Sequence, residues 1–168
     1  MNNLDNDDMA STRSASKKIK SNTKIHVLRR FEDFPTWITP DELAKFLYDS
    51  LKPYEDPLPQ VRQGISDAFE SHTGEPGFVL IAEIDQKVVG ALLMLRTGMK
   101  GYIPENLLLM VAVDPSTRGK GVGAQIIKRS FEIADGDVKL HVEYDNPAKR
   151  LYERLGMTSK YAEMRFIK

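Results

Sequence analysis

Seven consecutive residues without a polar side chain, LLLMVAV at 107–113, restrict the fold of this chain more than any other feature. A strand that is apolar at every position must be covered on both faces, so the run predicts an interior strand of a sheet. Asp114-Pro115 ends the strand, because proline has no N–H to donate to a neighbouring strand. Between Gly121 and Ala134 apolar side chains recur at helical spacing. The segment therefore predicts a buried strand, a tight turn and an amphipathic helix. The inward side of that helix comprises Ile127, Phe131 and Ala134, with Ile126 and Ser130 beside them.

The turn between this strand and helix is rich in glycine and in cations. Gly119, Gly121 and Gly123 stand beside Arg118 and Lys120. Glycine lets a backbone bring its N–H groups close to a ligand, and a helix N-terminus adds partial positive charge. This combination predicts a binding site for a pyrophosphate. The alternative is that the glycines only loosen the turn.

Two phosphate-binding motifs can be compared with this spacing. The nucleoside-triphosphate loop requires Ser or Thr after its Gly-Lys pair, but Gly121 follows Gly119-Lys120, so that motif is excluded. The dinucleotide fingerprint matches at Gly119-x-Gly121-x-x-Ala124, and Glu143 lies about twenty residues onward, where the fingerprint has its ribose-binding acid. It stays as an alternative, although the roughly forty-five residues after the loop are too few for the second half of such a domain.

The sequence after the helix predicts one more strand and one short helix. Apolar residues alternate over 138–144 with the period of a strand. Asn146 can cap a helix, Pro147 suits its first turn, and Gly156 can adopt the left-handed conformation that follows a last turn. A helix is therefore expected over 147–155.

The remaining segments complete a mixed α/β domain with one central sheet flanked by helices. Strands are expected near 24–29, 78–84, 88–96 and 159–167, and helices near 40–51 and 58–71. Residues 1–23 hold few apolar side chains and predict a disordered tail ahead of this single domain.

Three fragments in order resemble the GCN5-related N-acetyltransferase (GNAT) superfamily, across about residues 24–168. The first is RGKGVG at 118–123, which matches the family pattern of Gln or Arg, x, x, Gly, x, Gly or Ala. The second is a signature that reads Asn146, Ala148, Leu151-Tyr152-Glu153 and Gly156-Met157. The third is the hairpin sequence FVLIAEIDQKVVGALLML at 78–95. The resemblance implies a GNAT N-acetyltransferase domain that uses acetyl-CoA as its co-substrate.

The same resemblance implies where acetyl-CoA binds. Backbone groups of Val111, Ala112 and Val113 would contact the pantetheine arm. The pyrophosphate would lie on the turn and the start of the helix, which comprise Arg118, Gly119, Lys120, Gly121, Val122, Gly123 and Ala124. Asn146 is expected to contact the coenzyme, although the family has its Asn seven residues before the Tyr, where this chain has Asp145.

Acyl transfer also requires an acid and a base. Tyr152 is the expected general acid, because a phenol with an ordinary pKa of about 10 keeps its proton and can pass it to the departing thiolate. Glu105 is the expected general base, with Glu143 and His141 as alternatives. The chain has no cysteine, so we expect direct attack by the amine in a ternary complex rather than an acyl-cysteine intermediate. The alternative function is a GNAT-like module that binds acyl-CoA without turnover.

The charge balance and the composition of the chain limit the classes of partner that it is expected to bind. The 24 basic and 24 acidic residues cancel, so no nucleic-acid partner is expected, and no stretch approaches the about 18 apolar residues of a membrane span. Without cysteine neither a disulfide nor a thiolate zinc site can form, and no metal site is expected. Between Phe31 and Gln60 seven acidic residues stand against two lysines, which favours a cationic primary amine, either a small molecule or a peptide, as the acceptor. We expect a cytoplasmic enzyme, monomeric or homodimeric.

Overall fold

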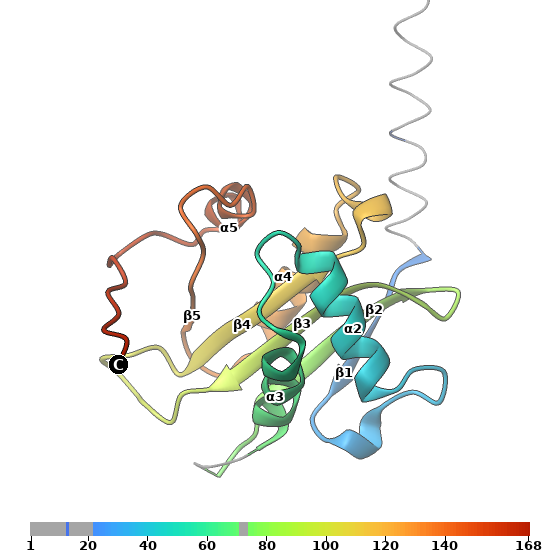
Figure 1. The fold of residues 1–168 in the computed structure, drawn as a ribbon, viewed down its shortest axis with the longest axis horizontal. Coiled ribbons are helices and arrows are strands. Elements are labelled where there is room, and N and C mark those ends of the chain that lie inside the picture. Colours follow the sequence, from blue (N-terminus) through green and yellow to red (C-terminus); the bar gives the residue numbers. More distant parts are fainter. Residues whose placement is uncertain (1–12, 14–21, 71–73) are drawn as a thin grey trace, which may run out of the picture.

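The chain folds around one five-stranded sheet (Figure 1). The computed structural model describes residues 13, 22–70 and 74–168, so the predicted tail over 1–23 lies almost wholly outside the described residues. The strands lie in chain order across the sheet, the first four antiparallel and the last pair parallel. They are β1 (Lys24–Leu28), β2 (Phe78–Ile84), β3 (Lys87–Arg96), β4 (Asn106–Val113) and β5 (Val138–Leu140).

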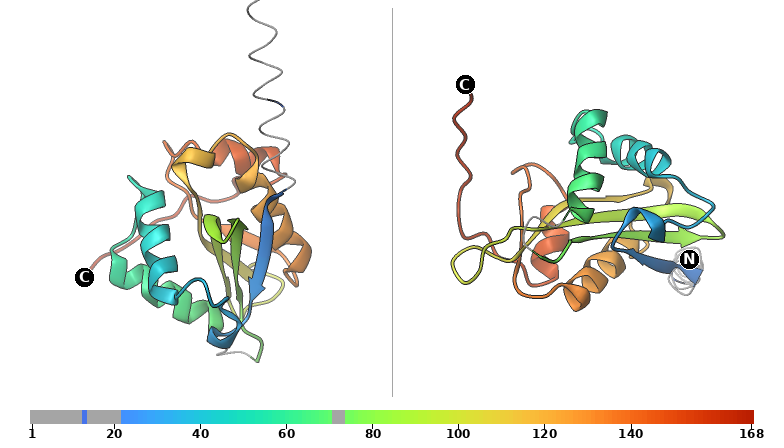
Figure 2. Two further views of the ribbon diagram at one scale, coloured as in Figure 1. Left: turned by 90° about the vertical axis from the view of Figure 1, so that its right-hand side faces the viewer. Right: turned by 90° about the horizontal axis from the view of Figure 1, so that it is seen from below.

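Helices cover both faces of the sheet. One face carries α2 (Pro40–Leu51) and α3 (Leu58–Phe69), and the other carries α4 (Val122–Ile133) and α5 (Lys149–Arg154), as Figure 2 shows. Short 3-10 turns follow β1 (η1, Phe31–Asp33) and β4 (η2, Pro115–Thr117). This is the predicted single-domain α/β arrangement. Among the described residues, no helix has both the length and the apolarity needed to cross a membrane.

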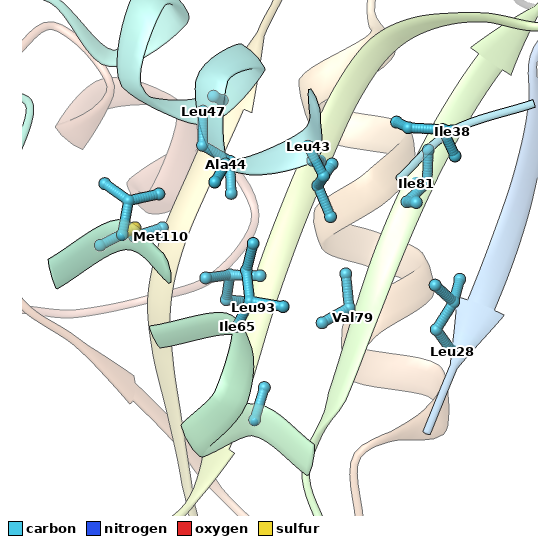
Figure 3. Packing of buried hydrophobic residues seen from close by; sticks show 14 residues of the cluster. Leu28, Ile38, Leu43, Ala44, Leu47, Ile65, Val79, Ile81, Leu93 and Met110 are labelled. Carbon is cyan, nitrogen blue, oxygen red and sulfur yellow. The ribbon is translucent and has the colours of Figure 1, made fainter. Parts of the chain in front are cut away.

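Strand alternation divides the core into two layers. Val79 and Ile81 face α2 and α3, whereas their neighbours in β2 face α4. Figure 3 shows the first layer, in which Leu43 and Leu47 of α2 pack over the sheet. Both leucines are fully buried, and each such side chain stabilises the fold by about 1.5–3 kcal/mol relative to exposure. The two helices that the sequence predicts at 40–51 and 58–71 therefore pack their apolar sides against this layer of the core.

An irregularity in β4 interrupts this alternation. Leu93 of β3 pairs with Met110 but Met94 pairs with Leu108, so Leu109 is an extra residue, a β-bulge. Leu109 and Met110 both pack on the α2–α3 side, while Leu108 packs on the α4 side. The predicted interior strand is confirmed, and every second residue of β4 is buried. The bulge bends the strand where the apolar run gave no sign of a break.

Two predicted strands differ from the structure. The strand expected over 138–144 ends at Leu140, because β5 pairs with β4 only over 106–108, before the bulge. The strand expected over 159–167 is absent from the structure, where these residues are exposed and irregular. Alternation gives a segment the capacity to form a strand, but a strand also needs a neighbour to pair with. The helix expected over 147–155 is Lys149–Arg154, preceded by a turn and closed by Gly156 at φ +96°.

A polar network holds β5 against the start of β4. Asn106 is buried, and its amide group donates to the carbonyl oxygens of Asp135 (2.8 Å) and Asp137 (3.1 Å). Arg96 donates to the Asn106 side-chain oxygen (3.0 Å) and to Asp135 O (2.6 Å). Glu105 accepts from the Asp137 N–H (2.8 Å). These bonds fix the turn between α4 and β5.

We predict that Asn106→Ala destabilises the domain by about 1–3 kcal/mol, because a buried side chain is removed together with its hydrogen bonds to Asp135 O, Asp137 O and Arg96. Urea unfolding followed by circular dichroism measures the change. The control is Lys128→Ala, which removes an exposed side chain from α4. Equal unfolding midpoints for the two variants would show that the network does not stabilise the fold.

Candidate active site

The outer edge of β4 beyond the bulge is not paired with another strand. From Leu109 onward β5 no longer lies beside β4, and Figure 1 shows the chain after β5 running away from β4 toward α5. On the other edge the Asp114 N–H donates to Val89 O (2.9 Å). In an antiparallel ladder the bonded pairs alternate, so the backbone groups of Val111 and Val113 point away from β3 while those of Ala112 pair with β3. Of these three predicted coenzyme contacts, Val111 and Val113 thus turn their amides to the unpaired edge.

The glycine turn leads from this edge into α4. Gly119 and Gly121 have φ values of +75° and +88°, in the left-handed region that other residues avoid. A Cβ on Gly119 would meet no atom within 4 Å, so its requirement in the free protein is conformational and not steric. Gly123 has a different reason, because a Cβ there would lie 3.2 Å from Leu151 of α5. The alternating glycines therefore shape the turn and let α5 pack against the start of α4.

The first turn of α4 has amide groups without partners. Gly121 is the N-cap, and the first bond of the helix runs from Gln125 N to Gly121 O (3.1 Å). Among the described residues no group accepts from the N–H of Val122, Gly123 or Ala124. Three N–H groups at a helix N-terminus form a site for an anion.

The two cations of the turn are bound to carbonyl oxygens of the chain itself. Arg118 donates through Nη2 to Ser50 O (2.5 Å) and through Nε to Val113 O (3.2 Å). Lys120 donates through Nζ to Ser116 O (2.7 Å). Because Ser50 O lies at the end of α2, the Arg118 guanidinium is stabilised by the helix dipole and fastens the turn to α2. Sequence reasoning missed this contact, since nothing in the sequence pairs positions 50 and 118.

Tyr152 lies on α5 with 9% of its surface exposed, packed in the layer beneath α4. Burial raises the pKa of its hydroxyl to about 12, and the negative charge of Glu143 adds to the rise. The phenol therefore keeps its proton at neutral pH. Since Leu151 packs on Gly123, α5 brings Tyr152 and the turn into one region with Glu143.

Asn146 starts the turn that leads into α5. Its side-chain oxygen accepts from the Ala148 N–H (2.9 Å), and its amide nitrogen lies 3.4 Å from Glu143 Oε2. The prediction that Asn146 caps the helix is wrong, because the N-cap of α5 is Ala148 and has no side-chain cap bond; Asn146 instead closes the turn ahead of the helix. Glu143 and His141 are exposed and lie just after β5.

Glu105 lies apart from the residues described above. It immediately precedes β4, at the end opposite the glycine turn, and eight residues of strand at about 3.3 Å each separate it from Val113. Its pKa is lowered by backbone N–H donors, its own and that of Asp137. The structure thus brings Tyr152 and Glu143 together with the turn and leaves Glu105 in the network that holds β5.

The α2–α3 link over 52–57 approaches the same region. The Tyr54 hydroxyl lies 3.4 Å from Asp145 O, in the turn before α5. Glu55 Oε2 is buried without a hydrogen-bond partner among the described residues. By contrast, Asp41 and Asp49, from the same acidic stretch, form ion pairs on the helices. No group of three or more His, Cys, Asp or Glu side chains in the described part of the chain could hold a metal.

Comparison with known proteins agrees with this geometry. Residues 75–157, from just before β2 to just after α5, match the model of the acetyltransferase (GNAT) domain. N-alpha-acetyltransferase 30 from Xenopus laevis is 26% identical over 127 residues, which cover 69% of this chain and 46% of that protein. The chain therefore spans just under half the length of this curated relative.

Solved structures share the fold. A possible acetyltransferase from Clostridium difficile 630 superposes with a TM-score of 0.62 at 23% identity, covering 87% of this chain and 97% of the other. An aminoglycoside N-acetyltransferase in complex with CoA gives a TM-score of 0.62 at 13% identity, with coverages of 87% and 94%. The glycine turn and Tyr152 both lie inside the matched domain. The family model thus identifies residues 75–157 of this chain as an acetyltransferase (GNAT) domain.

Proposed function

We propose that this protein is an acetyl-CoA-dependent N-acetyltransferase, which moves an acetyl group to a primary amine by direct attack in a ternary complex. The observation that carries the proposal is the set of three partnerless amides at the start of α4, directly after the unpaired edge of β4. The partnerless amides at the start of α4 suit a pyrophosphate, and the unpaired edge of β4 suits an extended arm that contains amide groups. Acetyl-CoA has both groups, in that order.

The coenzyme would bind mainly through backbone groups. The pyrophosphate would accept from the N–H groups of Val122, Gly123 and Ala124, with Lys120 able to exchange its carbonyl contact for a phosphate. The pantetheine arm would pair with β4 at Val111 and Val113, as a further strand would. Arg118 would act by holding the turn against α2, and Asn146 by shaping the turn before α5.

The transfer requires one bond to form and one to break between heavy atoms, together with two proton transfers. The amine nitrogen forms a bond to the thioester carbonyl carbon, and the carbon–sulfur bond breaks. The departing sulfur takes a proton from Tyr152, and the attacking nitrogen gives one up to a base. Positioning and stabilisation of the developing oxyanion by a β4 N–H supply most of the rate. We assign the base to Glu143, because its charge reaches Tyr152 whereas Glu105 is engaged by the Asp137 N–H.

The acceptor in this proposal is a cationic amine. Most of the acidic side chains over 31–60 have partners on the outer surface, but Glu55 has a buried oxygen free to accept a hydrogen bond. The adjoining Tyr54 contacts the turn that follows Glu143. An ammonium group beside Glu55 would place its carbon chain along this link. The name of one relative specifies acetylation at an alpha nitrogen, and the name of another specifies N-acetylation of an aminoglycoside, so both act on nitrogen.

A second candidate is a module that binds acyl-CoA without turnover. It is favoured by the engagement of Glu105 and by the leucines at 107–109, which leave the first half of β4 without a free carboxylate. Thiol release from acetyl-CoA across a panel of amines separates the two functions. Coenzyme binding without any thiol release would support the module.

We predict that Tyr152→Phe lowers kcat by about 10²-fold or more while the acetyl-CoA Kd stays the same, because the ring still packs and only the proton donor is lost. Steady-state kinetics and calorimetry measure the two quantities. Retention of nearly full kcat would remove Tyr152 from the mechanism.

We predict that Gly119→Ala weakens acetyl-CoA binding about tenfold or more, equivalent to about 1.4 kcal/mol. The new methyl group meets nothing in the free protein but occupies the space of the ligand. The matched control is Gly101→Ala, a glycine of φ +84° that also has open space and lies in the β3–β4 loop. Both changes strain the backbone alike, so an equal loss of affinity in both variants would contradict the assignment.

We predict that Glu55→Gln raises the KM for a polyamine about tenfold, or about 1.4 kcal/mol, and leaves the KM for a monoamine without a second charge unchanged. The control is Asp41→Asn, whose carboxylate pairs with Arg62 at 2.9 Å on the helices. If both amines respond equally to Glu55→Gln, the cationic acceptor is excluded.

A further inference from the structure

Gly64 lies inside α3 at a place where the backbone does not require glycine. It is buried on the side of the helix that faces the sheet, and its φ is not positive. Glycine weakens a helix interior relative to alanine, because it loses more conformational freedom on folding. A physical reason for glycine at this position is therefore to be found in the side chains that lie opposite it.

Three apolar side chains of the sheet crowd against Gly64. A Cβ at this position would lie 2.9 Å from Cδ2 of Leu109, 3.3 Å from Cδ1 of Leu93 and 3.9 Å from Cε of Met110. The first distance is well below the about 3.5–4.0 Å at which two carbon atoms pack. Leu93 and Met110 are partners in the β3–β4 ladder and lie on the face of the sheet shown in Figure 3.

The bulge in β4 accounts for the crowding. In a regular strand successive side chains point to opposite faces, so one face receives only every second residue. Leu109 and Met110 are successive, yet both pack on the α2–α3 side. The strand thus presents one side chain too many to α3, and α3 lacks a side chain at the position that would meet it. Gly64 and the bulge are complementary in shape.

Of the three opposing side chains, Leu109 has the most freedom to move. Leu93 is fully buried and Met110 is 6% exposed, whereas Leu109 is only partly buried. The atom nearest to the added Cβ is the tip of the Leu109 side chain, which can adopt another rotamer. Leu93 bounds it toward β3, but no described strand pairs with β4 at Leu109 on the other side. A larger residue at position 64 would therefore turn Leu109 toward the unpaired edge of β4.

The acyl end of the coenzyme would lie at this edge, if the protein binds acetyl-CoA as proposed above. An arm that runs from the start of α4 and pairs with Val113 and Val111 continues toward Leu109, which lies about 7 Å beyond Val111 at about 3.3 Å per residue. One residue further on, Leu108 pairs with Leu140 of β5, so the unpaired stretch ends there. The acyl group would thus lie beside Leu109, next to the end of β5.

We infer that Leu109 limits the length of the acyl group, and that Gly64 is a positioning residue that keeps the Leu109 side chain against α3. The inference rests on the proposed function and specifies its acyl donor. The donors that fit are coenzyme A thioesters of short, unbranched acyl groups, acetyl and propionyl. A longer chain meets the Leu109 side chain and the end of β5.

The first test measures the Kd of CoA, acetyl-CoA and propionyl-CoA by calorimetry. One methylene group in an apolar site changes affinity by about tenfold or more, so Gly64→Ala should weaken propionyl-CoA by about tenfold and acetyl-CoA by less than about threefold. The Kd of CoA, which has no acyl group, should stay the same. The control is Gln63→Ala, at the neighbouring exposed residue of α3, which should change none of the three.

A packing defect alone would weaken all three ligands alike in Gly64→Ala, and that result would overturn the positioning role. Gly64→Ala combined with Leu109→Ala supplies the rescue, because the added methyl group then meets no leucine tip. We expect the double variant to bind propionyl-CoA within about threefold of the original chain. A double variant as impaired as Gly64→Ala would contradict the pairing of the two residues.

Leu109→Ala alone keeps the inference testable even if Gly64→Ala does not fold, as judged by circular dichroism. It should strengthen the binding of butyryl-CoA by about tenfold and leave CoA unchanged, because the side chain that limits the acyl group is gone. An unchanged ratio of the butyryl-CoA and acetyl-CoA Kd values would overturn the inference and leave the proposed function intact. Absence of binding by every one of these thioesters to the original chain would overturn both.

Discussion

The extra residue at Leu109 is the constraint on which the arrangement of this molecule depends. It bends β4, so β5 can follow β4 for only three residue pairs. Beyond that point the outward-facing backbone amides of β4 have no described strand beside them. A regular β4 would continue its pairing with β5, and the chain would have no unpaired edge beside the glycine turn. The interior of the sheet is thus interrupted at one place, and the candidate site lies there.

Rigid packing surrounds this interruption. The network of Asn106, Arg96 and Glu105 fixes the near end of β5, while the Leu151–Gly123 contact fixes α5 on the start of α4. Tyr152 is packed between these contacts in an apolar layer, and this burial raises the pKa of its hydroxyl, so the hydroxyl keeps its proton. The contacts that stabilise the fold therefore also position the candidate site, most of which consists of backbone groups.

Much of this could be predicted from the sequence because it depends on local patterns. Proline at Pro40 and the Thr39–Glu42 capping box mark the start of α2, and alternation marks β2 and β3 with errors of one residue or none. The spacing of the glycines likewise predicts the tight turn that the structure has at Gly119 and Gly121. What the sequence did not reveal depends on pairing at long range. The bulge at Leu109 is hidden inside a uniform apolar run, the bond from Arg118 to Ser50 joins distant segments, and the end of β5 at Leu140 is set by β4.

The segment over 159–167 is a further case of this limit. Its residues alternate as in a strand, but no described strand lies beside it, so the local preference and the observed structure differ. The role of Glu105 illustrates the converse. In the sequence, Glu105 stands just before the strand that leads to the glycine turn, and this position suggests a general base. In the structure its carboxylate accepts a hydrogen bond from the Asp137 N–H and stabilises a turn.

The contact between Arg118 and the end of α2 makes two parts of the protein mechanically dependent. One guanidinium joins the carbonyl of Ser50 to that of Val113, and so links the helix that precedes the Tyr54–Glu55 link to the turn that leads into α4. Displacement at either end must be transmitted through this side chain. A ligand that rigidifies the turn would strengthen binding at the Tyr54–Glu55 link by some factor. Thermodynamic reciprocity then requires that a ligand at the link strengthens binding at the turn by the same factor. Because the coupling is reciprocal, it sets how strongly two ligands would reinforce each other and does not set which of them binds first.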